Sequence, residues 1–254
     1  MNFFKNSFRF FWRIWFYSWV FFSILVVLPV LFIIISNEKY YKTFYKIARV
    51  WGKTILFVMG FTPEITAEEE IEPDKSYMFI ANHASLVDIM LMLVAAKNPA
   101  VFVGKKELVK LPVFGYVFRK TSIWVDRSSL KSRKEVYERA QHKLNRGLSI
   151  IIFPEGLVPE EDIILSEFKN GAFRLAIEHQ IPIVPMTFLD VKKRFPWPFF
   201  SGWPGKLRVK IHPFIQTKGL TLNDLESIKR QSYDIIYNEL VNDMKNQDID
   251  VLKK

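Results

Sequence analysis

The 254-residue chain contains no cysteine. Disulfides, thiolate metal sites and cysteine nucleophiles are therefore excluded. Acidic residues are also in deficit, with 26 of them against 36 lysines and arginines, and the formal net charge is +10. Such a charge suits an anionic partner, which could be nucleic acid, a phosphorylated small molecule or an acidic membrane surface. The 24 phenylalanines and 7 tryptophans favour the membrane among these partners.

Charged residues are missing altogether from residues 14–36, a run of 23 positions. The run is long enough to cross a bilayer as a helix, and it is too long for a cleavable signal peptide. Its aromatic first half suits the headgroup level, and Pro29 predicts a kink or a reversal of the chain. Lysines and arginines flank the run on both sides, so no charge asymmetry specifies a single span.

Residues 40–61 mix cations with regularly spaced apolar side chains, which predicts a basic amphipathic helix. We therefore expect residues 1–61 to attach the protein to a membrane. They form either a single span or a helical hairpin that enters one leaflet, and we favour the hairpin, on the cytoplasmic face of the inner membrane. Residues 62–254 are expected to form the second domain.

In that domain short apolar runs alternate with charged helical stretches. The candidate strands are residues 77–81, 100–103, 122–125, 149–153, 183–188 and 207–211. The candidate helices are residues 86–96, 131–146, 172–179 and 221–246. This alternation predicts an α/β domain with a mixed, mostly parallel sheet flanked by helices.

A histidine and an aspartate five positions apart, His83 and Asp88, follow the first of these strands. A strand–turn–helix would bring the carboxylate back to the imidazole, where it accepts the Nδ1 proton and leaves Nε2 as a general base. The segment Ser85-Leu86-Val87-Asp88 also fits a capping box, in which Asp88 only satisfies a helix N-terminus. Both interpretations stay open at this point.

Further polar residues follow other strands of the predicted sheet. Glu155 stands in Phe153-Pro154-Glu155-Gly156 and is either a ligand for substrate hydroxyls or an ordinary loop carboxylate. Gly156 allows close approach of the backbone to a bound group. Lys105 and Arg127 each follow a strand, and several cations at one sheet edge suggest a phosphate site.

Two other chemistries receive little support. No cluster of histidines and carboxylates has metal-ligand spacing, so no metal is expected. The chain lacks the Gly-x-Ser-x-Gly elbow of serine hydrolases, which leaves a hydrolase that uses Ser85 beside His83 as a weaker alternative.

Four blocks in this order resemble the glycerolipid acyltransferase family, and they span residues 77–188. They are Asn82-His83 with Asp88, then Ile123-Trp124-Val125-Asp126-Arg127, then Phe153-Pro154-Glu155-Gly156 with Phe168-Lys169 and Gly171-Ala172, and finally Ile183-Val184-Pro185. The resemblance implies a glycerol-3-phosphate acyltransferase-like fold. It also implies that His83 is the base, that Asp88 orients it, and that Glu155, Gly156 and Arg127 help to bind a glycerol phosphate.

The implied reaction moves a fatty acyl group from acyl-CoA or acyl-carrier protein to the sn-2 hydroxyl of lysophosphatidic acid, with no further cofactor. The family pattern continues with Thr-Arg after the third block, whereas Leu157-Val158 stand here. An acyltransferase acting on another lysophospholipid or on glycerol 3-phosphate is therefore an alternative, and a non-catalytic membrane-tethered lipid-binding module is a more distant one. Nucleic acid is not expected, because the aromatic residues are not interleaved with lysine and arginine on a sheet.

Two apolar segments are candidates for lipid contacts. Leu108, Leu111, Val113, Phe114, Tyr116 and Val117 are candidates for the wall of an acyl tunnel or for ordinary core. Phe195-Pro196-Trp197-Pro198-Phe199-Phe200 is either a loop that dips into the membrane interface or a proline-rich loop packed on the body.

Overall fold

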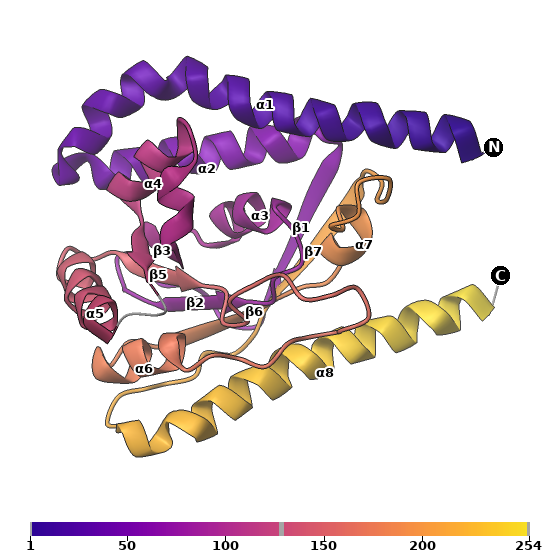
Figure 1. The fold of residues 1–254 in the computed structure, drawn as a ribbon. Helices are drawn as coiled ribbons and strands as arrows, with labels where there is room; N and C mark the ends of the chain where they lie inside the picture. Colours follow the sequence, from indigo (N-terminus) through magenta and orange to yellow (C-terminus); the bar gives the residue numbers. More distant parts are fainter. Residues whose placement is uncertain (1, 127–129, 253–254) are drawn as a thin grey trace.

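The computed structural model describes residues 2–126 and 130–252, and it contains a seven-stranded sheet in the order β1-β7-β6-β2-β5-β3-β4 (Figure 1). The strands are β1 (Phe61–Ala67), β2 (Met78–Ala81), β3 (Ala100–Lys105), β4 (Ile123–Val125), β5 (Ser149–Ile152), β6 (Ile183–Phe188) and β7 (Gly205–Ile211). All neighbouring strands pair in parallel except β6 and β7, which are antiparallel. The prediction of a mixed, mostly parallel sheet is confirmed.

Helices cover both faces of this sheet. They are α1 (Asn2–Ser36), α2 (Tyr41–Val58), α3 (Val87–Ala95), α4 (Phe114–Thr121), α5 (Leu130–Leu144), α6 (Gly171–Glu178), α7 (Val191–Arg194) and α8 (Leu225–Leu252), with 3-10 turns η1 (Glu38–Tyr40), η2 (Lys106–Lys110) and η3 (Leu222–Asp224). Helix α3 lies on one face, with α2 packed on it and α1 outermost (Figure 1). Helices α6 and α8 cover the opposite face (Figure 1).

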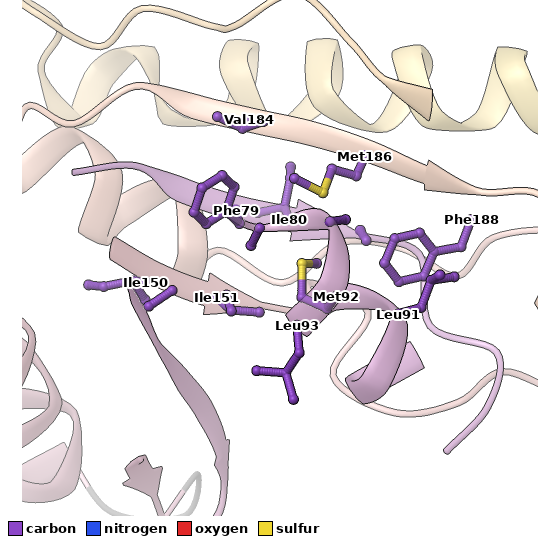
Figure 2. Packing of buried hydrophobic residues seen from close by; sticks show 14 of the residues in the cluster. Phe79, Ile80, Leu91, Met92, Leu93, Ile150, Ile151, Val184, Met186 and Phe188 are labelled. Carbon is purple, nitrogen blue, oxygen red and sulfur yellow. The ribbon is translucent and has the colours of Figure 1, made fainter. Parts of the chain in front are cut away.

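The centre of the core is the strand trio β6-β2-β5. Every side chain of β2 and of β6 is buried. Figure 2 shows Met92 of α3 lying beside Ile80 and Ile151 of the sheet, whereas Leu93 points away from the sheet. A parallel strand that is covered on both faces has a continuous apolar sequence instead of an alternating one. These strands could therefore be recognised in the sequence.

Strand β1, helix α4 and the short helix α7 are elements that the sequence analysis missed. Strand β1 contains Pro63 and pairs only with β7, from Phe61 opposite Gly205 to Ala67 opposite Ile211. Proline cannot donate to the ladder, so it is tolerated at this sheet edge but removes the strand signal from the sequence. Helix α4 occupies part of the segment that was considered as the wall of an acyl tunnel or as ordinary core.

Helices α1 and α2 form an antiparallel hairpin at the N-terminus. Helix α1 continues through Pro29 to Ser36 and is bent toward its C-terminal end, so the reversal occurs after the proline (Figure 1). The turn begins at Asn37, whose side chain accepts a hydrogen bond from the N–H of Lys39 at 2.9 Å. The Trp51 indole N–H of α2 donates to Ser23 Oγ of α1 at 2.8 Å, which fixes the pairing of the two helices.

The hairpin is fastened to the α/β body through α2 and the turn. The hydroxyl of Tyr41 donates to the carbonyl of Ala100 at 3.0 Å, and that of Tyr45 donates to the carbonyl of Ala96 at 2.9 Å. In the turn, Glu38 accepts from His142 and Lys143 of α5. Burial alone would raise the pKa of Glu38, but the hydrogen bonds from Lys143 and His142 lower it to about 2.

Helix α1 carries an apolar surface that faces away from the body. Among its described side chains the buried ones are Trp12, Arg13, Phe16, Leu31 and Ile35, whereas Phe4 is 80% and Ile33 is 73% exposed. By length and composition, Phe3–Ser36 is the one described helix that could cross a membrane. An unburied apolar helix of this length indicates membrane association.

Candidate active site

The chain leaves β2 at Ala81 and enters the turn that carries His83. Asn82 is 6% exposed and fixes the start of this turn, because its side-chain amide donates to the carbonyl of Phe188 at 3.1 Å and accepts from the N–H of Phe188 at 2.8 Å. Phe188 ends the neighbouring strand β6. The turn is thus attached to two adjacent strands before it reaches α3.

His83 and Asp88 meet across this turn. The imidazole Nδ1 lies 2.7 Å from Oδ2 of Asp88, which is completely buried. With Asp88 ionised, Nδ1 carries the proton and donates it to the carboxylate, which leaves the lone pair of Nε2 free. The His83 side chain is 20% exposed, so a substrate can reach the ring. The predicted proximity of the two side chains is confirmed.

The same carboxylate also serves the N-terminus of α3. Oδ2 of Asp88 accepts the backbone N–H of Ala84 at 2.6 Å and of Ser85 at 2.8 Å. A carboxylate in the first turn of a helix is also stabilised by the helix dipole. The orienting and capping interpretations are therefore not exclusive, because one oxygen holds both the imidazole and the turn.

Glu155 connects this turn to the loop that follows β5. Its Oε1 accepts the backbone N–H of His83 at 2.7 Å, and its Oε2 accepts the N–H of Ser166 at 2.7 Å. The side chain is 2% exposed, and burial raises the pKa of Glu155 to about 7 against the opposing effect of the two N–H donors. Its observed contacts are with the backbone, so Glu155 positions His83, and a contact with substrate remains a prediction.

Neighbours of Glu155 complete the turn. The N–H of Gly156 donates to the carbonyl of Phe153 at 3.0 Å, and Gly156 has a φ of +79°, which glycine adopts without strain. The ring of Phe153 stacks on the imidazole of His83, with centroids 4.4 Å apart and planes 18° apart. This stacking restricts the rotation of the imidazole, and sequence reasoning did not find it because nothing local signals it.

Of the two cations predicted to bind phosphate, Lys105 is the one that the structure places at the same edge of the sheet. Lys105 is the last residue of β3, opposite Val125 of β4, and it is exposed. Within the described part of the chain Lys105 has no hydrogen-bond or ion-pair partner. Arg127 lies outside the described residues. The sheet therefore brings His83, Glu155, Gly156 and Lys105 to one edge, since β2, β5 and β3 are parallel neighbours.

A further cation near this edge was not singled out as a site residue. Lys192 of α7 donates to the carbonyls of Glu160 and Ile163 in the loop that follows Gly156. Burial lowers the pKa of Lys192, while the charges of Glu155, Asp162 and Glu161 act in the opposite direction. Lys192 thus holds the loop in which Leu157-Val158 replace the expected Thr-Arg.

Two cavities differ in their relation to this site. One of about 590 Å³ is lined by charged side chains of α5 and by the start of β4, and neither His83 nor Glu155 contributes to it. One of about 180 Å³ is lined by Ser85 and Leu86 of the His83 turn together with α1. The smaller cavity is therefore the one that borders the candidate active site.

Comparisons with known proteins agree with this geometry. The family model described as Acyltransferase matches residues 62–189. The 1-acyl-sn-glycerol-3-phosphate acyltransferase alpha of Mus musculus is 27% identical over 248 residues, which cover 94% of this chain and 85% of that protein. The 1-acyl-sn-glycerol-3-phosphate acyltransferase of Limnanthes alba is 29% identical over 194 residues, covering 74% of this chain and 67% of the relative.

A solved structure supports the fold independently. The crystal structure of the 1-acyl-sn-glycerophosphate (LPA) acyltransferase PlsC from Thermotoga maritima superposes with a TM-score of 0.75 at 24% identity, over 95% of this chain and 97% of that one. The family model covers half of the chain and includes both His83 and Glu155. The chain belongs to the acyltransferase family.

Proposed function

We propose that this protein transfers a fatty acyl group from an acyl thioester to the sn-2 hydroxyl of lysophosphatidic acid, giving phosphatidic acid. The observation that carries the proposal is the His83–Asp88 pair, with 2.7 Å between Nδ1 and Oδ2, in a chain of the acyltransferase family. The choice of acceptor is supported by the names of the relatives, which are 1-acyl-sn-glycerol-3-phosphate acyltransferases.

In the proposed reaction Nε2 of His83 removes the proton of the sn-2 hydroxyl while that oxygen attacks the thioester carbonyl. The buried Asp88 carboxylate stabilises the imidazolium that forms. When the tetrahedral intermediate collapses, the carbon–sulfur bond breaks and the imidazolium returns its proton to the thiolate. One C–O bond replaces one C–S bond, His83 ends neutral, and no covalent acyl-enzyme is needed.

The acceptor's phosphate would lie toward Lys105, Arg127 and the backbone of Gly156. Guanidinium and ammonium groups bind phosphate through charge-assisted hydrogen bonds, and Lys105 is exposed and free for such a contact. The charge of Glu155 lies close enough to raise the pKa of Lys192, and Lys192 would add to the same positive field. These cations would compensate for the arginine that the family pattern carries where Val158 stands.

Membrane attachment would come from residues 1–61. We propose that the α1–α2 hairpin enters one leaflet on the cytoplasmic face of the cell membrane, with the α/β domain of residues 62–254 outside the hydrocarbon. Two features support this location: the exposed apolar surface of α1 and the fastening of α2 to the body. The donor would be acyl-CoA or acyl-carrier protein, both of which reach this face from the cytoplasm.

The test is transfer from radiolabelled acyl-CoA or acyl-carrier protein to lysophosphatidic acid by the full chain in mixed micelles. We expect labelled phosphatidic acid from the wild type, and a kcat lower by about 10²–10⁴-fold for His83→Ala, which removes the general base. His142→Ala is the matched control, since His142 is an exposed histidine that pairs with Glu38 far from β2.

The acceptor is tested in the same assay with other lysophospholipids and with glycerol 3-phosphate. Faster transfer to one of these acceptors than to lysophosphatidic acid would reassign the acceptor. Absence of transfer to all of them, from both donors, would refute the enzyme assignment. Equal activity of His83→Ala and the wild type would refute the mechanism.

A further inference from the structure

Arg13 of α1 is a buried cation, 2% exposed, that binds a loop 183 residues further along the chain. Its guanidinium donates to the carbonyls of Pro196, Pro198 and Ser201 and lies over the ring of Phe195, 3.8 Å from the centroid. Among the described residues no carboxylate pairs with Arg13. Burial of a charge is costly unless the charge is hydrogen-bonded, and the three carbonyls of this loop satisfy Nη2 of Arg13, whereas the buried Nε has no partner in the part of the chain that the structure describes.

Apolar contacts hold the base of the same loop on α1. Phe195 is 1% exposed and packs against Trp12 and Phe16, with ring centroids 5.3 Å and 4.7 Å apart. Farther along, Trp203 contacts Phe8 at 4.5 Å. The loop between α7 and β7 is therefore fixed to the N-terminal half of α1 by rings and by the Arg13 guanidinium together.

The outer side chains of these two segments form one apolar surface, which we name the α1–loop surface. It consists of Phe8, Phe10 and Phe11 of α1 and of Trp197, Phe200 and Trp203 of the loop, all of them exposed. Tryptophan and phenylalanine gathered on the outside of an apolar helix are typical of the membrane interface.

The cavity of about 180 Å³ opens between these segments. Arg13 and Tyr17 of α1 form one wall, and Phe195, Pro196 and Trp197 form the second. Ser85 and Leu86 form the third, and they belong to the turn between His83 and Asp88. A single small cavity thus joins the α1–loop surface to the turn that carries the candidate base.

We infer that this cavity receives the ester-proximal methylenes of the acyl chain of a single-chain lipid acceptor, which enters from the bilayer across the α1–loop surface. The inference rests on the proposed function. Arg13 is then a positioning residue, since it holds the Phe195–Trp197 wall without touching the reacting atoms. At about 30 Å³ per water the cavity has room for about six waters, so it holds the first few methylenes and leaves the rest of the chain in the bilayer.

The acceptor fits this cavity better than the donor does, for a reason of solubility. A lysolipid resides in the bilayer, whereas acyl-CoA and acyl-carrier protein are water-soluble and approach from the aqueous side. Two substrates that reach one histidine from different phases need separate entrances. The cavity borders the lipid-facing side, and its walls are mainly rings and Leu86.

The first test fills the cavity and varies the chain length of the acceptor. In Leu86→Trp we expect the KM for long-chain lysophosphatidic acid to rise about tenfold, as the displacement of two methylenes predicts. The KM for an acceptor whose acyl group is acetyl, which has no methylenes to place in the cavity, and the KM for the acyl donor should stay unchanged. Leu222→Trp is the control, because Leu222 is similarly exposed, at 46% against 39%, and lies in η3.

The second test detects binding without turnover. A lysophosphatidic acid with a diazirine within the first carbons of its chain is photolysed with the full chain in micelles. We expect the label on the peptides that contain Leu86 or Trp197, and a loss of most of this label in Arg13→Gln, whose folding is checked by thermal unfolding.

The outcomes separate the inference from the proposed function. A label elsewhere, or a KM shift in Leu86→Trp that is as large for the acetyl acceptor as for acceptors with longer chains, refutes the cavity as the acceptor site. A shift that follows the donor's chain length assigns the cavity to the donor and also refutes the inference. Labelling of these peptides in a protein that transfers no acyl group would support the lipid site and refute the enzyme.

Discussion

The residues at the carboxyl ends of β2 and β5 differ from those at the ends of β3 and β4 in the contacts that hold them, although all four strands end on the same side of the sheet. At the first pair, Asn82, His83, Asp88 and Glu155 are each fixed by short hydrogen bonds to neighbouring backbone or side chains. At the second pair, Lys105 is exposed and held by no described contact. The residues proposed for proton transfer are therefore held by the fold, whereas Lys105, the expected phosphate-binding cation that the structure describes, is left for the substrate to order.

The largest effect on activity should come from a substitution among the firmly held residues that follow β2. In Asp88→Asn the amide keeps an oxygen for the turn, but the negative charge that stabilises the His83 imidazolium is lost. We expect kcat to fall by about 10³–10⁴-fold with little change in the KM for lysophosphatidic acid, as for other histidine–aspartate pairs. Steady-state kinetics in mixed micelles measure both quantities.

Asp190→Asn is the matched control for that variant. Asp190 is also a buried aspartate, but it binds Arg208 and joins β7 to α7 instead of touching His83. It should lower thermal stability and leave kcat near the wild-type value. If both variants reduced kcat to the same degree at equal folded fraction, Asp88 would have only a structural role.

The next effect concerns the pH dependence of stability at Glu155. Because burial raises the pKa of Glu155 from 4.5 to about 7, the folded state favours the protonated carboxyl. Its contribution to stability is fully present below about pH 4.5 and is lost as the pH rises to about 7, with an upper value of about 3 kcal/mol. In Glu155→Gln this pH-dependent contribution should disappear.

The measurement is the free energy of unfolding in detergent micelles between pH 4.5 and 8, for the wild type and for Glu155→Gln. Taking the difference between the two proteins removes the contributions of the other titrating groups. We expect the wild type to lose stability relative to the variant as the pH rises. A difference that stays constant over this range would mean that Glu155 ionises in the fold as it does in the unfolded chain.

The separation along the chain between contacting residues explains how much of the fold and of the site could be predicted from the sequence. The His83–Asp88 contact spans five residues in a strand–turn–helix, so local geometry was enough to predict it. The strands β2, β5 and β6 were visible as buried apolar runs, whereas Pro63 concealed the edge strand β1.

Contacts over long sequence separations could not be found in this way. Glu155 binds the N–H of His83 across 72 residues, and Arg13 binds the carbonyl of Pro196 across 183. Neither pair has a local pattern, because each depends on how the sheet and the hairpin assemble. The Pro29 signal was equally limited: it predicted a kink or a reversal but could not place the turn at Asn37.

The smallest effect should come from adding a phosphate ligand to the loop that follows β5, where an arginine can be restored. Val158→Arg places a guanidinium two residues after Gly156, as in the family pattern, in a loop whose neighbour Leu157 is exposed. One added charge-assisted hydrogen bond to phosphate is worth about 1.5–3 kcal/mol at most, and ordering a long side chain offsets part of it. We therefore expect the KM for lysophosphatidic acid to fall by about twofold to tenfold at unchanged kcat.

The matched control is Val158→Gln, which has a long polar side chain without the charge, and lysophosphatidylcholine is the control acceptor. A phosphomonoester carries more negative charge than a phosphodiester next to a choline, so the arginine should favour lysophosphatidic acid selectively. Equal gains for both acceptors, or for both variants, would mean that position 158 does not face the phosphate. In that case the two pairs of strand ends would differ only in how firmly their residues are held. They would not divide into one pair for proton transfer and one pair for phosphate recognition.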